Sequence, residues 1–397
     1  MQMTKNLFIA RNGRPSVPCR IRRHMKSCAT STSTALFLGL VGCGGATATT
    51  PNADGIVVQS VAGGFDTIWS MVWAPDATIW ISERPGMVSR VNPVSGSVTR
   101  IGQLPVSEIG EGGLMGLALH PDFSTQPWVY AAYTTTTAGR TQNRVVRMLF
   151  TGGALGAPEI LIDDIPGASV HNGSRLAIGP DRLLYVTTGD AASAESAQDR
   201  ASLAGKILRV TLDGRPAPGN PFGTSVYSFG HRNPQGISFS PAGTLYETEH
   251  GPSDNDEVNR IQAGANYGWP SVRGYCDGDA GPNELRFCQA NGIVEPLRAW
   301  TPTIAPSGLA FYDSPRIPAW RGSLLFTTLN GRALHRLTIS TNGSAVTAAE
   351  TLFAGEFGRL RDVLVAPDGT VYIATSNKDG RGSPQAGDDR ILRIVPK

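Results

Sequence analysis

Four segments of this chain carry polar and charged side chains next to glycines, in a pattern that suits a binding or catalytic site. They are EGGLMGLALHPDF from Glu111, HNGSRLAIGPDRLLYVTTGD from His171 to Asp190, residues 229–270, and FGRLRDVLVAPDG from Phe357. A histidine there provides a base with a pKa near neutrality, carboxylates provide ligands for a hard cation, and arginines bind anions. Each segment borders a predicted strand, so we expect these side chains to project from loops where strands end.

One repeated phrase provides the framework that positions these segments. A Pro-Asp-type turn is followed by an alternating run of β-forming residues, as in APDATIWISER and APDGTVYIATSN. Copies are roughly 45 to 80 residues apart, near the size of a four-stranded propeller blade, and begin at Ala74, His120, Gly179, Ser240, Trp320 (loosely) and Ala366. Since no long stretch has a helical period, we predict an all-β fold. It is a six-bladed β-propeller of four-stranded antiparallel blades around a central channel.

Each copy of the phrase carries one aromatic residue at the same place. These residues are Trp80, Tyr130, Tyr185, Tyr246, Phe326 and Tyr372. We interpret them as packing between blades, which leaves the chemistry to the loops around the channel.

The four segments resemble those of the soluble quinoprotein sugar dehydrogenases, the PQQ-dependent glucose and aldose sugar dehydrogenases with a six-bladed propeller. The resemblance covers about residues 60–395 and depends on HNGSRLAIGPD, GHRNPQG, HGPSDNDEVN, NYGWP and GRLRDV, which occur in family order. It implies PQQ- and calcium-dependent oxidation of aldose sugars at the anomeric carbon to lactones, with electrons passed to an unidentified acceptor. Propellers are also reused for binding, so the fold alone does not establish the activity.

The resemblance implies a catalytic set of His171, Asp190 and Arg232. Oxidation of a sugar hydroxyl needs a base that takes the proton while hydride leaves carbon; His171 is that base and Asp190 orients it. Arg232 and Asn233 match the contacts to the reactive quinone carbonyl, where they stabilise the negative charge that hydride transfer creates. The alternative role for His171 is only to cap a loop by hydrogen bonding.

The resemblance also implies a wider set of contacts to the anionic cofactor. Arg359 and Arg361 match positions that hold its carboxylates, and two residues spaced by two on a strand share one face. Surface ion pairs are the alternative for these two arginines. The expected cofactor-binding residues are Glu111, His171, Arg232, Asn233, His250, Thr303, Asn330, Arg359 and Arg361.

Some positions depart from the family pattern. Asn330 stands where the family has a lysine, which leaves one cation missing unless Arg332 replaces it. Glu111 and His250 stand at glutamine positions, and Thr301 stands at an aromatic position. These departures weaken the expectation of tight PQQ binding and of narrow glucose specificity.

The loop HGPSDNDEVN supplies the oxygen atoms that calcium prefers. By resemblance, the carbonyls of Gly251 and Pro252 bind the calcium ion that bridges to the quinone. Glu257 and the carbonyl of Tyr267 then bind a second, structural calcium ion. From the residues alone, an acidic solvated turn is an equally good interpretation.

Two other functions remain alternatives. One is a non-catalytic, surface-tethered binding propeller, against which the set of His171, Arg232, Asn233, Arg359 and Arg361 argues. The other is a calcium-dependent lactone hydrolase on the same architecture, which would need metal but no quinone.

The N-terminal region predicts export. Residues 25–43 have a basic start, a short apolar run and the ending Leu-Val-Gly-Cys of a lipoprotein-type signal peptide, so we expect lipidation at Cys43. A plain secretory signal is the alternative. Residues 1–24 are interpreted as an unstructured or non-native extension, residues 44–58 as a flexible tether and residues 59–397 as the propeller. The expected location is the bacterial periplasm or cell envelope, with membrane contact only through the lipid.

Charge and cysteine usage agree with an exported protein. Seven of the 35 basic residues and no acidic residue fall within residues 1–42, which leaves 28 basic against 32 acidic residues beyond them. This balance argues against nucleic-acid binding as the function. Cys276 and Cys288 lie in one loop, and a disulfide between them is the preferred interpretation, with two free thiols as the alternative. A homodimer is possible.

Overall fold

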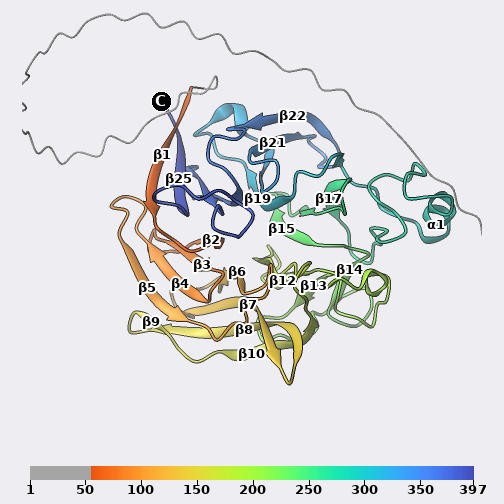
Figure 1. Cartoon of the computed structure of the whole chain (residues 1–397), viewed down its shortest axis with the longest axis horizontal. Coiled ribbons are helices and arrows are strands. Elements are labelled where there is room, and N and C mark those ends of the chain that lie inside the picture. Colours follow the sequence, from red (N-terminus) through yellow and green to blue (C-terminus); the bar gives the residue numbers. More distant parts are fainter. Residues whose placement is uncertain (1–54) are drawn as a thin grey trace, which may run out of the picture. The chain divides into compact units, whose positions relative to one another are not determined.

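The repeated phrases fold into six antiparallel sheets arranged in a ring around a channel (Figure 1). The computed structural model describes residues 55–397. The extension, the signal peptide with Cys43, and residues 44–54 of the tether lie outside the described residues. The predicted all-β, six-bladed propeller is confirmed.

Blades are numbered in chain order and their strands are given from the channel outwards. Blade one contains β2 (Ile68–Trp73), β3 (Ile79–Glu83), β4 (Met87–Val91) and β5 (Val98–Gln103). Blade two contains β6 (Leu114–Leu119), β7 (Trp128–Thr137), β8 (Arg140–Thr151) and β10 (Glu159–Pro166), and the short β9 (Ala154–Leu155) pairs with β8. Blade three contains β11 (Leu176–Ile178), β12 (Leu184–Thr188), β13 (Lys206–Val210) and β14 (Val226–Phe229).

The second half of the ring repeats this arrangement. Blade four contains β15 (Pro234–Phe239), β16 (Leu245–Glu249), β17 (Asp256–Ile261) and β18 (Arg298–Trp300). Blade five contains β19 (Pro306–Tyr312), β20 (Ser323–Thr328), β21 (Leu334–Ile339) and β22 (Val346–Leu352). Blade six contains β23 (Leu360–Val365), β24 (Val371–Thr375), β25 (Arg390–Pro396) and β1 (Ile56–Gly63). The first strand of every blade contacts the first strands of both neighbouring blades, so these six strands line the channel.

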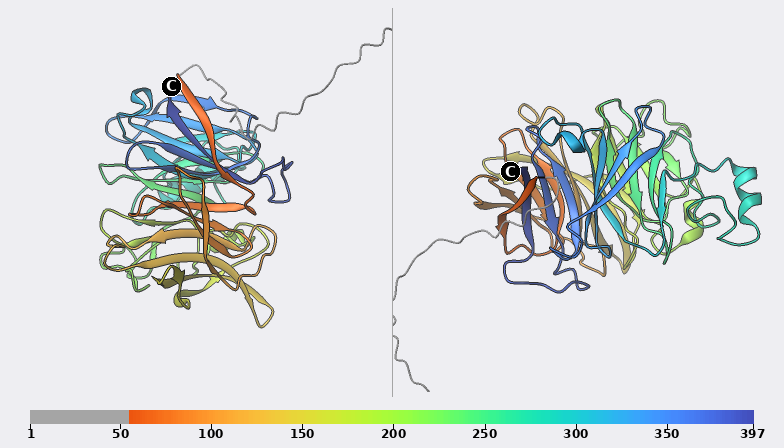
Figure 2. Two further views of the ribbon diagram at one scale, coloured as in Figure 1. Left: turned by 90° about the vertical axis from the view of Figure 1, so that its left-hand side faces the viewer. Right: turned by 90° about the horizontal axis from the view of Figure 1, so that it is seen from above.

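The two ends of the described chain close the ring together. Strand β1 is antiparallel to β25, with Ile56 opposite Pro396 and Val58 opposite Ile394 (Figure 2). The outer strand of the last blade therefore comes from the start of the propeller. Residues 56–58, which the sequence analysis assigned to the tether, belong to this strand because Ile56 and Val58 alternate into the core of blade six.

The repeated aromatic residues lie on the second strand of each blade, and all six are buried. Tyr185 packs edge-on against Phe239 of blade four, with 5.0 Å between ring centroids. Tyr372 of blade six packs against Trp73 of blade one at 6.0 Å. The prediction that these residues join neighbouring blades is confirmed, and their burial explains why the phrase recurs.

Channel-lining strands approach one another so closely that some positions exclude a side chain. A Cβ atom at Gly308 on β19 would lie 2.0 Å from the carboxylate of Asp362 on β23. At Gly116 on β6 it would lie 2.2 Å from the carbonyl oxygen of Ser174. Glycine at these positions lets the inner strands pack into a narrow ring.

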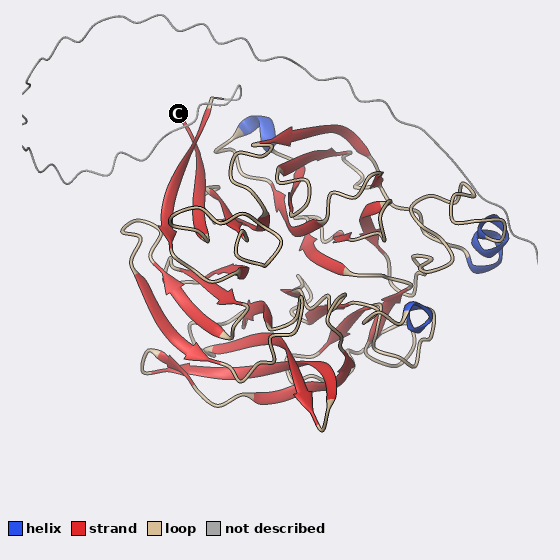
Figure 3. Cartoon of the chain, in the orientation of Figure 1, coloured by secondary structure: helices blue, strands red, loops and turns tan. Residues whose placement is uncertain are grey.

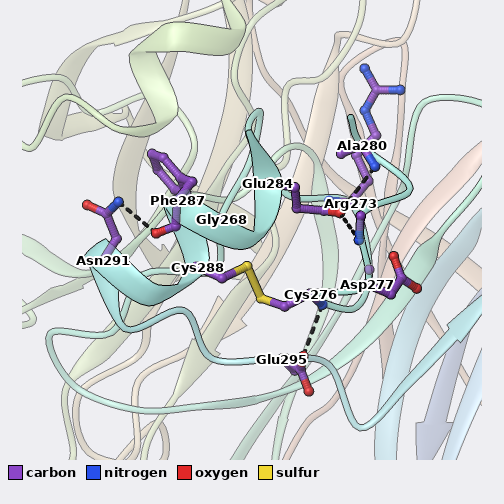
Figure 4. The surroundings of a disulfide bond; sticks show 12 residues. Gly268, Arg273, Cys276, Asp277, Ala280, Glu284, Phe287, Cys288, Asn291 and Glu295 are labelled. Carbon is purple, nitrogen blue, oxygen red and sulfur yellow. Dashed lines mark hydrogen bonds between the residues drawn. A yellow bond between two sulfur atoms is a disulfide. The ribbon is translucent and has the colours of Figure 1, made fainter. Parts of the chain in front are cut away.

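Helices are short and lie outside the blades (Figure 3). The helix α1 (Glu284–Asn291) belongs to the long connection between β17 and β18, where a disulfide joins Cys276 and Cys288 (Figure 4). The backbone N–H of Cys276 donates to the carboxylate of Glu295 at 2.9 Å. Among residues 55–397, no helix is long and apolar enough to cross a membrane.

Candidate functional site

One end of the channel holds a polar cavity of about 470 Å³. Within an antiparallel pair, the start of the inner strand and the end of the second strand lie at the same end of the sheet. Loops at exactly those positions line the cavity, which explains why segments far apart in the sequence meet there. The lining residues that carry charge are Arg84, Glu111, Arg359, Arg361, Asp379 and Arg381.

His171 and Asp190 form a hydrogen-bonded pair beside this cavity. The ring Nδ1 of His171 lies 2.7 Å from Oδ1 of Asp190, and the His171 backbone N–H donates to the cavity-lining Glu111 at 3.2 Å. Asp190 is almost fully buried and also accepts hydrogen bonds from the indole of Trp269 and the backbone of Ala192. A carboxylate so held accepts a hydrogen bond from Nδ1–H, and in this tautomer the lone pair of Nε2 can act as a base.

Arg232 bridges this pair and a neighbouring loop. Its Nη2 lies 3.0 Å from Nε2 of His171. Its Nη1 donates to the backbone carbonyls of His250 and Gly251, at 3.0 and 2.7 Å. Burial lowers the pKa of Arg232, although surrounding carboxylates oppose this shift. The guanidinium thus covers the nitrogen of the candidate base.

Several buried nitrogen atoms around the cavity have no hydrogen-bond partner within residues 55–397. They are Nε of Arg232, Nδ2 of Asn233, Nε2 of His250 and Nε of Arg361. Of these residues, His250 and Arg361 line the 470 Å³ cavity, whereas Arg232 lines a smaller cavity that shares His250 with it. Buried polar atoms are normally satisfied, so the unpaired nitrogens of His250 and Arg361 suit a ligand that offers hydrogen-bond acceptors. Asn233 itself accepts the Gly173 N–H at 3.1 Å, which holds its amide close to the His171 loop.

Arg359 and Arg361 both reach the cavity, and Leu360 between them is fully buried in the core of blade six. Arg359 donates to the carboxylate of Asp379 at 2.8 Å, and Arg361 donates to the amide oxygen of Gln235 at 2.7 Å. Burial lowers the pKa of Arg361 to about 10, so it remains charged at neutral pH.

Glu111 contributes a negative charge to the lining of the cavity. Its Oε1 pairs with Arg381 at 2.7 Å, an arginine from the glycine-rich loop after β24 that the sequence analysis missed. Burial alone raises the pKa of Glu111, but the charge of His250 and the hydrogen bond from Arg381 outweigh it, and the net shift is downward. Arg381 is therefore the ion-pair partner of Glu111 at this cavity.

The position expected to carry a family lysine remains without a cation. Asn330 lines the cavity and donates to the carbonyl of Thr303 at 2.9 Å, while the hydroxyl of Thr303 donates to Asp256 at 2.5 Å. The residues that line the cavity include Arg84 and Arg381 but not Arg332. A positive charge that replaces the lysine therefore comes from Arg84, after β3 of blade one, or from Arg381, after β24 of blade six. The sequence pattern did not point to either residue.

Residues expected to bind calcium gather beside Arg232. Gly251, Pro252, Glu257 and Tyr267 line one small cavity together with Arg232 and Glu249. The carboxylate of Glu257 accepts the Gly274 N–H at 2.8 Å and the Asn259 amide at 2.9 Å. Backbone carbonyls of His250 and Gly251 converge on one cationic nitrogen of Arg232, so this backbone is arranged to face positive charge.

Hydrogen-bonded side chains of the inner strands lie between this cavity and a second one. Arg175 pairs with Asp362 at 3.1 Å, donates to the Gln235 carbonyl at 2.8 Å and stacks over Trp69. The backbone carbonyl of Gln235 accepts from Arg175, whereas its side-chain oxygen accepts from Arg361, which lines the polar cavity. A second cavity of about 500 Å³ lies on the far side, at the C-terminal ends of the same inner strands.

The chain is similar to one group of known proteins. A family model described as glucose/sorbosone dehydrogenase matches residues 65–392. The quinoprotein glucose dehydrogenase B of Acinetobacter calcoaceticus is 30% identical over 415 residues, covering 82% of this chain and 86% of that protein. The aldose sugar dehydrogenase YliI of Escherichia coli is 28% identical over 347 residues, covering 84% and 91%. The PQQ-bound aldose sugar dehydrogenase of Streptomyces coelicolor is 39% identical with a TM-score of 0.76, covering 86% of this chain and 98% of that chain.

Proposed function

Because the chain belongs to the glucose/sorbosone dehydrogenase family, we propose that it oxidises aldose sugars at the anomeric carbon to lactones, with PQQ as cofactor. The family and its relatives make the chain an oxidoreductase of the PQQ-dependent sugar dehydrogenase type. The observation that carries the finer proposal is the 2.7 Å pair of His171 and Asp190 at the edge of a cavity lined by four arginines.

The residues present fit an anionic cofactor. Four arginines against two carboxylates give the cavity a net positive lining, and the unpaired Nε of Arg361 provides a donor to it. The unpaired Nε of Arg232 belongs to the smaller neighbouring cavity. A volume of about 470 Å³ is within the range of small-molecule sites. When bound, PQQ supplies the quinone that accepts the hydride. Arg359 and Arg361 then hold its carboxylates, and Arg232 and Asn233 face its reactive carbonyl.

His171 takes the proton of the sugar hydroxyl at Nε2. Asp190 holds Nδ1 protonated, orients the ring and stabilises the imidazolium ion that forms. Because Nη2 of Arg232 lies 3.0 Å from Nε2, this guanidinium must turn away before the base can meet a substrate hydroxyl.

The Gly251 carbonyl accepts a hydrogen bond from Nη1 of Arg232 at 2.7 Å. The carbonyls of Gly251 and Pro252 would hold a calcium ion, and Arg232 would have to turn away from Gly251 to make room for it. The same movement of Arg232 would expose Nε2 of His171. Glu257 and Tyr267 are proposed for a second calcium ion near the same cavity.

The test is reconstitution of the full chain with PQQ and calcium, followed by reduction of an artificial electron acceptor with aldoses. We expect turnover that a calcium chelator abolishes. The change His171→Gln should lower kcat by a factor of about 10²–10⁴, the usual contribution of a general base, while PQQ still binds. Absence of turnover with every aldose, or an unchanged kcat in the variant, contradicts the proposal.

We also propose that the protein acts in the bacterial cell envelope, anchored through a lipid on Cys43. The support is the sequence of residues 25–43 alone. A separate electron acceptor and a homodimer stay predictions.

A further inference from the structure

Blade four contains a buried group of ionisable side chains that the proposed sugar oxidation does not use. His231 precedes β15, and Glu247 and Glu249 lie two residues apart on β16, so their side chains share one face of the sheet. One nitrogen or oxygen atom from each lies within 4.8 Å of the others. All three residues are buried, and β17 places Asn259 opposite Glu247 and Glu257 opposite Glu249.

These carboxylates lack a positive partner. Within residues 55–397, the only ion pair formed by Glu247, Glu249 or Glu257 is the contact of Glu249 with His231 at 3.4 Å. Glu247 and Glu249 are both buried and share one face of β16, and a bound cation would stabilise two such carboxylates in a desolvated place.

Two buried oxygen atoms of this group have no hydrogen-bond donor in the described part of the chain. They are Oε1 of Glu247 and Oδ1 of Asn259, and both residues are fully buried. Nδ2 of Asn259 lies 2.9, 3.2 and 3.4 Å from carboxylate oxygens of Glu257, Glu247 and Glu249. One amide has only two hydrogens for three acceptors. Rotation of the amide by 180° about its terminal bond aims its oxygen into the group.

His231 is already oriented as a ligand. Its Nε2 lies 2.9 Å from the hydroxyl of Ser228, and its ring stacks on Tyr267 with 4.7 Å between centroids. The Ser228 hydroxyl can donate to Nε2 or accept from it, and when Nε2 is the protonated nitrogen, Nδ1 can bind a metal. Nδ1 lies 3.4 Å from Oε1 of Glu249, which is about the separation of two ligands bound at about 2.1 Å to one tetrahedral ion.

We propose that His231, Glu247 and Glu249, with Asn259 as a further oxygen ligand, bind a divalent transition-metal ion of the zinc or manganese class. One imidazole nitrogen among carboxylate oxygens favours such an ion over calcium, which takes oxygen ligands. The ion ties the loop before β15 to β16. Because Oε2 of Glu249 accepts the Arg232 backbone N–H at 2.7 Å, it also holds the backbone of Arg232. The proposal does not depend on the proposed sugar oxidation.

The experiment uses Co²⁺ as a spectroscopic probe on the full chain after treatment with a chelator. We expect about one equivalent of Co²⁺ to bind with ligand-field absorption bands that a hundredfold excess of calcium leaves unchanged. Zn²⁺ should displace the bands because zinc binds such sites more tightly than cobalt. No stoichiometric binding, or displacement by calcium, overturns the proposal.

Variants locate the ion, and matched controls separate a metal site from general damage. Glu247→Gln and His231→Gln should each weaken Co²⁺ binding at least tenfold. Glu83→Gln and His335→Gln change a buried glutamate and a buried histidine of other blades, and they should leave binding unchanged. Unchanged binding in Glu247→Gln overturns the assignment. Should the variants fail to fold, anomalous diffraction from wild-type crystals grown with zinc decides, since a peak away from His231 Nδ1 and Glu249 overturns it equally.

Discussion

At the scale of residues, the geometry of the site is set by the hydrogen bonds and ion pairs of its charged side chains. Arg232 bonds to His171, His250 and Gly251, residues up to 61 positions away in the sequence, and these contacts join the candidate base to the candidate calcium ligands. Glu111 and Arg381 are 270 positions apart and still form a direct pair. The chemistry of the site is therefore set by long-range pairs more than by any single motif.

Arg381 is expected to support cofactor binding by neutralising Glu111. Replacing Arg381 with alanine leaves a carboxylate unpaired next to the anionic PQQ, so PQQ affinity should fall about threefold to tenfold, equivalent to about 1 kcal/mol for a partly exposed pair. The measurement is a PQQ titration with calcium present, followed by fluorescence quenching.

The double change Arg381→Ala with Glu111→Gln should restore most of that affinity. Arg140→Ala is the control, because the Arg140 side chain is about as exposed as that of Arg381 and it pairs with Asp164 on β10, away from the cavity. A double variant that binds no better than Arg381→Ala alone contradicts the explanation.

At the scale of elements, each second strand carries an aromatic residue that joins blades, and blade five adds a histidine to this packing. The ring of His335 on β21 stacks on Phe326 of β20 at 4.9 Å between centroids, and Trp300 of blade four packs edge-on against Phe326. Burial lowers the pKa of His335 to about 4. The His335 ring that packs in blade five is therefore neutral at neutral pH.

This histidine should make the stability of the protein depend on pH between about 6.5 and 4. In that interval the unfolded state binds a proton on His335 and the folded state does not, so the free energy of unfolding falls as the pH falls. The loss should reach about 3 kcal/mol at pH 4. Urea unfolding at several pH values measures it, and His335→Gln should flatten this part of the profile. Equal slopes in the variant and the wild type contradict the assignment.

The sequence was sufficient for the elements because their signal is local. A turn such as APDG followed by alternating residues determines a hairpin without help from distant segments, as in β23 and β24, where Asp368 accepts the Thr370 N–H at 2.9 Å. The contacts of Arg232 with carbonyl oxygens, the pair of Glu111 and Arg381, and the cluster of His231 with Glu247 and Glu249 gave no such signal. They form only when loops of different blades or facing strands meet.

At the scale of the whole molecule, the ring is closed by strands from both ends of the described chain. Val58 on β1 is buried with the core of blade six, which also contains Leu392 and Ile394 of β25. Blade six is therefore complete only when β1 is in place, and the inner strand β23 carries Arg361 into the site.

A charged residue on the buried face of β1 should disrupt the packing of β1 in blade six, which closes the ring. Val58→Asp should destabilise the protein by about 3 kcal/mol or more, because an unpaired carboxylate enters an apolar core. Thermal unfolding measures the effect, and PQQ binding should weaken with it. Ser60→Asp on the exposed part of the same strand is the control. A similar loss of stability in both variants would show that the strand tolerates no charge at all, against this account.

The contacts among Arg175, Asp362 and Gln235 have a consequence for how substrate and product reach and leave the cavity. Because these side chains lie between the two cavities, the sugar and the lactone of the proposed oxidation would both use the opening on the side of His171. Under that proposal, product and substrate compete for one opening, and added lactone should inhibit turnover.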